Sequence, residues 1–276
     1  MSDTLAHIID DLIDHVSVLK ELGNRTVKVD PQVVRDITAI KMPKPDQQQP
    51  VAKSDTRKKR EPLSIAVLQS SRPLSPEERK KAMQHLLHEM NHCFDCGLCR
   101  HRTTPIIGEG NLNTPDIMFI GPAPDAQDDK TGRPFSGAAG DLLTKMIEAM
   151  SYKREDVFLT NTCKCRTPND RAPTMDEMIS CSHYFEEQIK IVRPKSIVVF
   201  GEHANKGLFH NHRTASRPQG TWTKYHGIPV MPTFHPKFIL RFSNDAEGQQ
   251  QELKRSVWSA LKGVMLLLRS FSSDSI

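Results

Sequence analysis

DIMFIGPAPDAQDDKTGRPFSGAAGDLLTKMIEAM, residues 116–150, is the stretch that decides the fold. It opens with a short apolar strand (116–121), passes through a loop rich in Gly and Pro, and ends in a pattern typical of an amphipathic helix (140–150). The same order of elements returns further along the chain. Strands are predicted at 156–161, 196–201 and 228–236, and helices at 174–192 and 250–270.

Strands that alternate with helices at this spacing predict a parallel sheet covered by helices. We therefore expect an α/β fold, a three-layer α/β/α sandwich with a central, mostly parallel four-stranded sheet, plus an N-terminal helix and linker. In such sheets ligands bind beyond the carboxyl ends of the strands. That rule points to four loops, at 121–137, 161–171, 201–203 and 235–241.

The sequence divides into three parts by composition. Residues 1–24 carry Leu, Ile and Val at spacings of three and four, which predicts an amphipathic helix. Residues 25–72 are polar and include a stretch rich in Pro and Gln, which indicates a flexible basic linker, and residues 73–276 form the α/β domain. The first helix is expected to bind a protein partner, to self-associate or to pack on the domain.

Charge gives weaker information about partners and location. The net charge is +5 and the sequence pI is about 8.9, which suits a nucleic-acid partner but is also common among proteins that bind none. The first 14 residues hold four Asp, and no Lys or Arg precedes Lys20, whereas the leading region of a signal peptide is positive. No run of 18 uncharged apolar residues exists. We expect a cytoplasmic protein with no membrane partner, and a monomer.

All six cysteines lie between residues 93 and 181. CFDCGLC (93–99) places three of them in seven residues, CKC (163–165) adds two, and Cys181 stands alone. Clustered thiols in a reducing compartment more often bind metal than form disulfides. A zinc ion and a [4Fe–4S] cluster both accept four thiolates, so spacing does not separate them.

Three motifs carry a resemblance to a known family. They are GPAPDAQDDKTGRPFSGAAG (121–140), TNTCKCRTPNDRAP (160–173) and FHPKFILR (234–241). In this order they resemble the family 4, or iron–sulfur, uracil-DNA glycosylases, over roughly residues 90–268. The resemblance implies a base-excision DNA-repair hydrolase that flips uracil out of DNA, cleaves its N-glycosidic bond and leaves an abasic site.

The resemblance also implies a [4Fe–4S] cluster and its ligands. The family's ligands fall on Cys93, Cys96, Cys165 and Cys181. Cys99 and Cys163 are then neighbours of the cluster that do not bind it. We expect the cluster to be structural.

Roles in the substrate site follow from the same motifs. The resemblance makes Phe135 the aromatic wall that stacks on uracil, and Asn161 the amide that reads its Watson–Crick edge. His235 would donate to uracil O2 as negative charge develops there. The strand end is expected to line the base site with Gly121, Pro122 and Ala123. The segment after His235 resembles the loop that wedges into the duplex, with Lys237, Phe238 and Arg241 on DNA.

Two departures fall at the centre of the chemistry. The family's GEAPG carries a Glu, often assigned to the hydrolytic water, where this chain has Pro122, and its last Gly is Asp125. Asp128 aligns with the first residue of the family's acidic pair and is our candidate for positioning water instead. Two alternatives therefore stay open: a slow or inactive glycosylase-fold protein that binds DNA or damaged bases, and a zinc-bound α/β domain with an unrelated nucleotide ligand.

Overall fold

A computed structural model describes residues 72–209, 219–242 and 248–273. The chain divides into two units, residues 1–63 and 64–276, and the described residues all belong to the second. The predicted N-terminal helix (1–24) and nearly all of the predicted linker (25–72) lie outside the described residues.

The domain is built on one six-stranded sheet with the order β1-β3-β2-β4-β6-β5. Its centre, β3-β2-β4-β6, is parallel, and each edge strand is antiparallel to its neighbour. The strands are β1 (Glu109–Gly110), β2 (Ile117–Gly121), β3 (Phe158–Asn161), β4 (Ser196–Phe200), β5 (Thr223–Tyr225) and β6 (Ile228–Thr233). The four predicted strands are the parallel centre, which confirms the predicted α/β fold. The edge strands were not predicted, because two or three residues are too few to show an alternating pattern.

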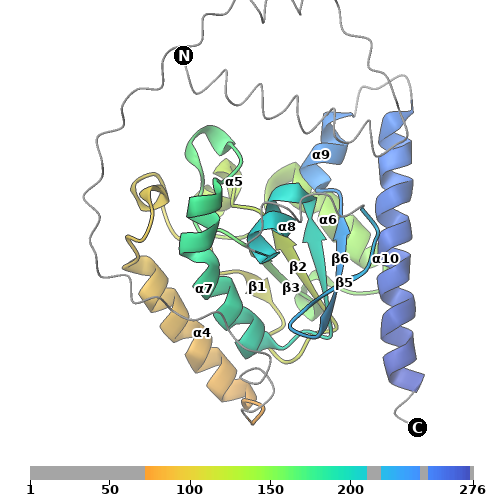
Figure 1. The fold of residues 1–276 in the computed structure, drawn as a ribbon, viewed down its shortest axis with the longest axis horizontal. Helices are drawn as coiled ribbons and strands as arrows, with labels where there is room; N and C mark the ends of the chain where they lie inside the picture. The colour runs from red at the N-terminus through yellow and green to blue at the C-terminus, as the bar shows by residue number, and fades with distance from the viewer. Residues whose placement is uncertain (1–71, 210–218, 243–247, 274–276) are drawn as a thin grey trace, which may run out of the picture. The chain divides into compact units, whose positions relative to one another are not determined.

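Helices cover both faces of the sheet (Figure 1). The described helices are α4 (Pro76–Asn91), α5 (Ala126–Thr131), α6 (Gly137–Ala149), α7 (Met175–Val192), α8 (Gly201–Phe209), α9 (Pro236–Arg241) and α10 (Gln249–Ser273). Helix α4 packs on α7 and α7 on α8, whereas α6 and α10 both contact α9 and α10 also contacts β6. Successive residues of β2, such as Met118 and Phe119, point to opposite faces of the sheet and are both fully buried.

Local sequence explains where the two longest helices before β4 begin. Ser75 caps α4, and the Glu78 side chain accepts from the Ser75 amide in return. Thr174 and Glu177 form the same reciprocal cap at α7. Cys181 lies near the start of α7, where its thiol accepts from the backbone amide of Lys164 in the loop after β3. Within the described ranges, no helix has the length and apolar character needed to cross a membrane.

Two predicted loops contain short helices. Residues 126–131 form α5. Asp125 caps its N-terminus, and Gly132 caps its C-terminus in the left-handed conformation (φ 71°). Residues 236–241, expected as a loop, form α9, because Pro236 suits a first helical position and His235 caps the helix. Both helices lie at the carboxyl end of the sheet, where ligands are expected.

Candidate functional site

Three predicted side chains meet beyond the ends of β2, β3 and β6. The ring centroids of Phe135 and His235 lie 5.8 Å apart, with their planes inclined by 25°. A Cβ atom on Gly121 would lie 2.8 Å from Phe135 Cζ and 2.4 Å from Asn161 Oδ1. Glycine at the end of β2 therefore lets the phenyl ring and the carboxamide approach the same point. The structure brings Phe135, Asn161 and His235 into one site.

Asn161, the last residue of β3, holds an unpaired amide in this site. The residue is 2% exposed, and its backbone carbonyl accepts from Lys164 Nζ at 2.6 Å. Its side-chain Nδ2 is buried and has no hydrogen-bond partner among the residues that the structure describes. An unpaired buried donor costs about 1–3 kcal/mol, so native proteins rarely keep one without a reason. The free amide is what a site for a polar ligand requires.

His235 is held in one tautomer. Its Nδ1 accepts from the backbone amide of Lys237 at 3.0 Å, which caps α9. In a neutral ring the proton is then on Nε2, so this nitrogen is a donor. Burial, followed by the positive charges of Lys237 and Arg241, lowers the pKa of His235 to about 3. The ring is therefore neutral at physiological pH.

Phe135 lies in a turn that holds it in an unfavourable backbone conformation. Its φ of 51° is left-handed, which costs a bulky residue about 1–3 kcal/mol. The ring is 5% exposed and also meets Phe200 edge-on, with centroids 5.8 Å apart. Helix α6 approaches the turn so closely that a Cβ on Gly140 would lie 1.6 Å from the Phe135 carbonyl oxygen. Only glycine fits there, so the sequence GAAG is part of the site's construction.

The carboxylates next to this turn are engaged by protein donors. Asp128 Oδ1 accepts from the amide and the hydroxyl of Ser136, both at 2.7 Å. Asp125 caps α5 by accepting from the amides of Gln127 and Asp128. Burial raises the pKa of Asp128, and its bonds to Ser136 oppose that shift. Asp128, the candidate for water positioning, thus also holds the residue that follows Phe135.

Pro122 stands where the resemblance leads one to expect a glutamate, so this position has no side-chain carboxylate. Its backbone carbonyl still serves as an acceptor. Its carbonyl accepts from the Thr162 hydroxyl at 2.7 Å and from the Cys163 amide at 2.9 Å. The half-buried Ala123 follows it. These bonds tie the loop after β2 to the loop after β3.

The residues expected on DNA lie on α9. Lys237 and Arg241 are exposed, one turn apart. Phe238 is half-buried between two aromatic rings, with centroids 6.1 Å from Phe234 and 5.2 Å from Phe242. The cationic side chains therefore project from a short helix that begins at His235.

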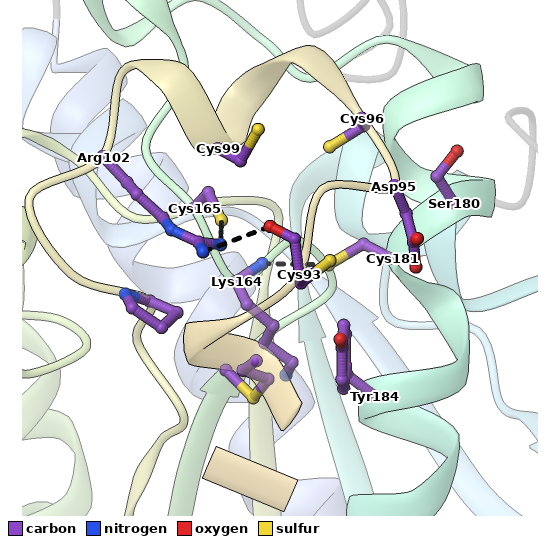
Figure 2. A pocket seen from close by; sticks show the side chains of 12 residues that line it. Cys93, Asp95, Cys96, Cys99, Arg102, Lys164, Cys165, Ser180, Cys181 and Tyr184 are labelled. Atoms are coloured by element: carbon purple, nitrogen blue, oxygen red, sulfur yellow. Dashed lines mark hydrogen bonds between the residues drawn. The ribbon is translucent and has the colours of Figure 1, made fainter. Parts of the chain in front are cut away.

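A second site lies at the junction of η1 (Gly97–Arg100), the loop after β3, and α7. Five thiols line one pocket there, those of Cys93, Cys96, Cys99, Cys165 and Cys181 (Figure 2). The structure thus brings together all four predicted ligands and, with them, Cys99. Cys163 is fully buried, and the pKa of its thiol is raised by its interaction with Cys181 and by burial.

Cationic and backbone donors face the sulfurs of this pocket. Arg102 Nη1 donates to Cys165 Sγ at 3.1 Å, and its Nη2 to the Cys93 carbonyl at 3.2 Å (Figure 2). The backbone amide of Lys164 donates to Cys181 Sγ at 3.3 Å. Donors of this kind favour thiolates over thiols.

The thiols of the pocket are a donor set that two kinds of occupant share. Both a zinc ion and an iron–sulfur cluster accept four thiolates, so the lining of the pocket fits either group. Among the described residues, no group of three or more His, Cys, Asp or Glu that could hold a single metal ion is found.

Comparison with known proteins agrees with the geometry. Residues 107–262 match the model of the uracil DNA glycosylase superfamily. The chain is 37% identical over 187 residues to the type-4 uracil-DNA glycosylase of Thermotoga maritima, an alignment covering 65% of this chain and 91% of that protein. It is 39% identical over 183 residues to the type-4 enzyme of Sulfurisphaera tokodaii, covering 63% and 83%. The chain belongs to the type-4 uracil-DNA glycosylase family.

A buried lysine connects the two sites of this family member. Lys164 is 1% exposed and stands between Cys163 and Cys165, the second of which lines the thiol pocket. Its Nζ donates to Asn161 O at 2.6 Å, to Thr160 Oγ1 at 2.7 Å and to Gln188 Oε1 at 2.6 Å. One residue therefore binds Cys181 through its backbone and supports Asn161 through its side chain.

Sequence reasoning missed the residues that support the site. Arg154 and Glu109 bind at the Phe135 turn, and Arg102 binds in the thiol pocket. None of them lies in the three motifs. The sequence contains a signal only for Lys164, because a lysine between two clustered cysteines is expected to make hydrogen bonds near their site.

Proposed function

We propose that this chain removes uracil from DNA by hydrolysing its N-glycosidic bond and leaving an abasic site. Membership of the type-4 uracil-DNA glycosylase family supports the reaction. The unpaired Nδ2 of Asn161 is the observation that carries the proposal, because it provides a fixed, buried donor for a polar base.

Recognition requires a base that has left the duplex. We assign Phe135 to the wall on which uracil stacks, and the residues Gly121, Pro122 and Ala123 to the edge of the slot. Asn161 then donates from Nδ2 to uracil O4 and accepts from N3–H. Cytosine presents an amino group where uracil has O4, so the same amide is left without an acceptor. An unmet buried donor is a strong basis for rejecting the wrong base.

Cleavage leaves negative charge on uracil O2, and His235 is placed to meet it. The Nδ1 atom accepts from the backbone, so Nε2–H is the donor for the departing base. The ring donates while neutral, so no proton has to be taken up first. We assign Asp128 to the oxocarbenium-like sugar and its water, in addition to its hold on Ser136.

The groups around the slot suit a nucleic-acid substrate. Lys237 and Arg241 are exposed on α9 and suit phosphates on either side of the extruded nucleotide. Phe238, in the same helix, is our candidate for filling the gap that the base leaves.

A [4Fe–4S] cluster suits the thiol pocket, where Cys93, Cys96, Cys165 and Cys181 would hold it. When bound, it would supply a rigid cross-link among the end of α4, the loop after β3 and α7. Arg102 and the Lys164 amide would stabilise its thiolates. We assign no step of the reaction to it.

A second candidate function is a base-binding protein that cleaves slowly. The observation in its favour is that position 122 is proline, while Asp125 and Asp128 already accept protein hydrogen bonds. Retention of the His235 donor favours the active enzyme, since binding alone needs no stabilised oxyanion.

The test is single-turnover cleavage of a uracil-containing oligonucleotide, followed by alkali to break abasic sites. The proposal predicts strand breaks at uracil and none in the matched cytosine oligonucleotide. Tight binding to the uracil strand without breaks would establish the second candidate instead.

A further inference from the structure

The turn that carries Phe135 is gripped by an arginine from outside the motifs. Arg154, in η2 (Arg154–Asp156), donates from Nη2 to the carbonyl of Pro134 at 2.7 Å and to that of Phe135 at 3.1 Å. These are the carbonyls directly before and at the residue with the left-handed φ of 51°. Backbone in such a conformation persists only where its surroundings hold it.

Arg154 is itself fixed by two other elements. Its Nε donates to Glu109 Oε1 in edge strand β1 at 2.6 Å, and its Nη1 to the Thr144 hydroxyl in α6 at 3.1 Å. The side chain is 20% exposed. A planar guanidinium with three nitrogens engaged has little freedom left, so it transmits the position of the sheet edge and of α6 to the turn.

The same turn is held from its other side by an anion. Asp128 binds the amide and hydroxyl of Ser136, directly after Phe135. Arg154 therefore binds the backbone carbonyls of Pro134 and Phe135, and Asp128 binds the amide and the hydroxyl of the next residue.

We propose that Arg154, oriented by Glu109, is a positioning residue that fixes the Phe135 ring for stacking on the extruded base. The inference rests on the proposed function, because the ring has a task to be positioned for only if the slot receives a base. Arg154 does not touch the reacting atoms. Arg154 affects the reaction by fixing the position of the Phe135 ring.

The chain offers a matched control in Arg133. It pairs with the same carboxylate, Nε to Glu109 Oε2 at 2.7 Å, but its side chain is 64% exposed. Arg133→Met removes one cation from Glu109 and leaves the bonds from Arg154 to the turn in place. Arg154→Met removes those bonds. Arg154→Lys keeps the charge, but it lacks the three separate nitrogens that bind Glu109, Thr144 and the turn at once.

The experiment compares these three full-length variants with the wild type in two measurements. The first is backbone hydrogen exchange of the segment 133–140, followed by mass spectrometry. The second is single-turnover uracil release beside the dissociation constant for the same DNA. We expect Arg154→Met to speed exchange in this segment and to slow release about 10- to 100-fold, with DNA affinity within about threefold of wild type. Arg154→Lys should fall between, and Arg133→Met should match the wild type.

Two outcomes overturn the inference. One is exchange in segment 133–140 that is equal in Arg154→Met and Arg133→Met. The other is faster exchange in Arg154→Met with an unchanged rate of release. If Arg154→Met does not fold, Arg154→Lys decides between the same outcomes. A wild type that releases no uracil contradicts the proposed function, and the exchange measurement still shows whether Arg154 fixes the turn.

Discussion

The thiol pocket and the base slot, which is formed by Phe135, Asn161 and His235, both adjoin the loop after β3. They differ in whether their polar groups have partners. Around the thiols, Arg102 and the Lys164 amide already donate to sulfur. In the base slot, the Asn161 amide keeps a buried donor with no partner among the described residues. Under the proposed function, the first region takes a permanent occupant and the second a transient one. We therefore expect the thiol pocket to hold the loop after β3 in place while the slot stays open.

The largest effect should come from removing a predicted cluster ligand. Cys165→Ala is expected to yield colourless protein with little iron and to lower the melting temperature by at least about 4 °C, because binding to a site formed only on folding stabilises the fold. Iron content and visible absorption measure the first effect, and thermal unfolding the second.

Cys99→Ala is the matched control, since Cys99 lines the same pocket. It should keep its iron. Equal iron loss in both variants would show that the ligand set assigned here is wrong.

The second largest effect is expected from a substitution that changes the base slot alone. Asn161→Asp replaces the unpaired donor with an acceptor at the same place. Uracil release should fall about 100-fold or more, because uracil O4 then faces a carboxylate. Iron content and DNA affinity should not change. Release at the wild-type rate would mean that another group reads the base.

A smaller effect should follow from cutting the connection between the regions. Lys164→Met leaves Thr160, Gln188 and the Asn161 carbonyl without their buried donor, which should cost about 1–3 kcal/mol of stability. We expect release to slow about tenfold while iron is retained, because Asn161 loses its support.

Lys195→Met is the control, since Lys195 pairs with Asp116 at the start of β2, away from the slot. Lost stability without slower release would reduce Lys164 to a purely structural residue.

The smallest effect is an expected lack of change with pH. The folded pKa of His235 is about 3, whereas an unfolded histidine titrates near about 6.5. The carbon-bound proton signals of the His235 ring should therefore stay constant from pH 8 to about pH 5, followed by NMR and assigned with His235→Gln. Titration near the ordinary value would contradict a buried neutral donor.

The same pKa difference has a consequence for stability. Only the unfolded chain binds the proton between these values, so acid favours unfolding. His235 should lower stability progressively as the pH falls below about 6.5, until the folded pKa is reached, and should have no such effect above it.

The sequence predicted what repeats or clusters along the chain. Apolar strands between helices gave the parallel centre of the sheet, and the spacing around Cys93 and Cys96 indicated the thiol pocket. The edge strands β1 and β5 were beyond reach, because their few residues follow from the neighbours they pair with.

The supports of the base slot were beyond reach for a different reason. Arg154 and Glu109 lie 45 residues apart, and neither has a pattern that marks it among other charged residues. Only the folded chain brings both to the Phe135 turn. The predicted N-terminal helix and linker stay predictions, since they lie outside the described residues apart from Arg72.

The proposed function requires the buried side-chain amide of Asn161 to recognise uracil. NMR of this amide tests the requirement most directly. Protein labelled with ¹⁵N at asparagine would be titrated with free uracil and, separately, with cytosine, the Asn161 signal being assigned by its absence in Asn161→Asp. We expect uracil to shift this signal and cytosine to leave it in place. An Asn161 signal that does not respond to uracil, or that responds equally to both bases, would contradict recognition of uracil by this amide.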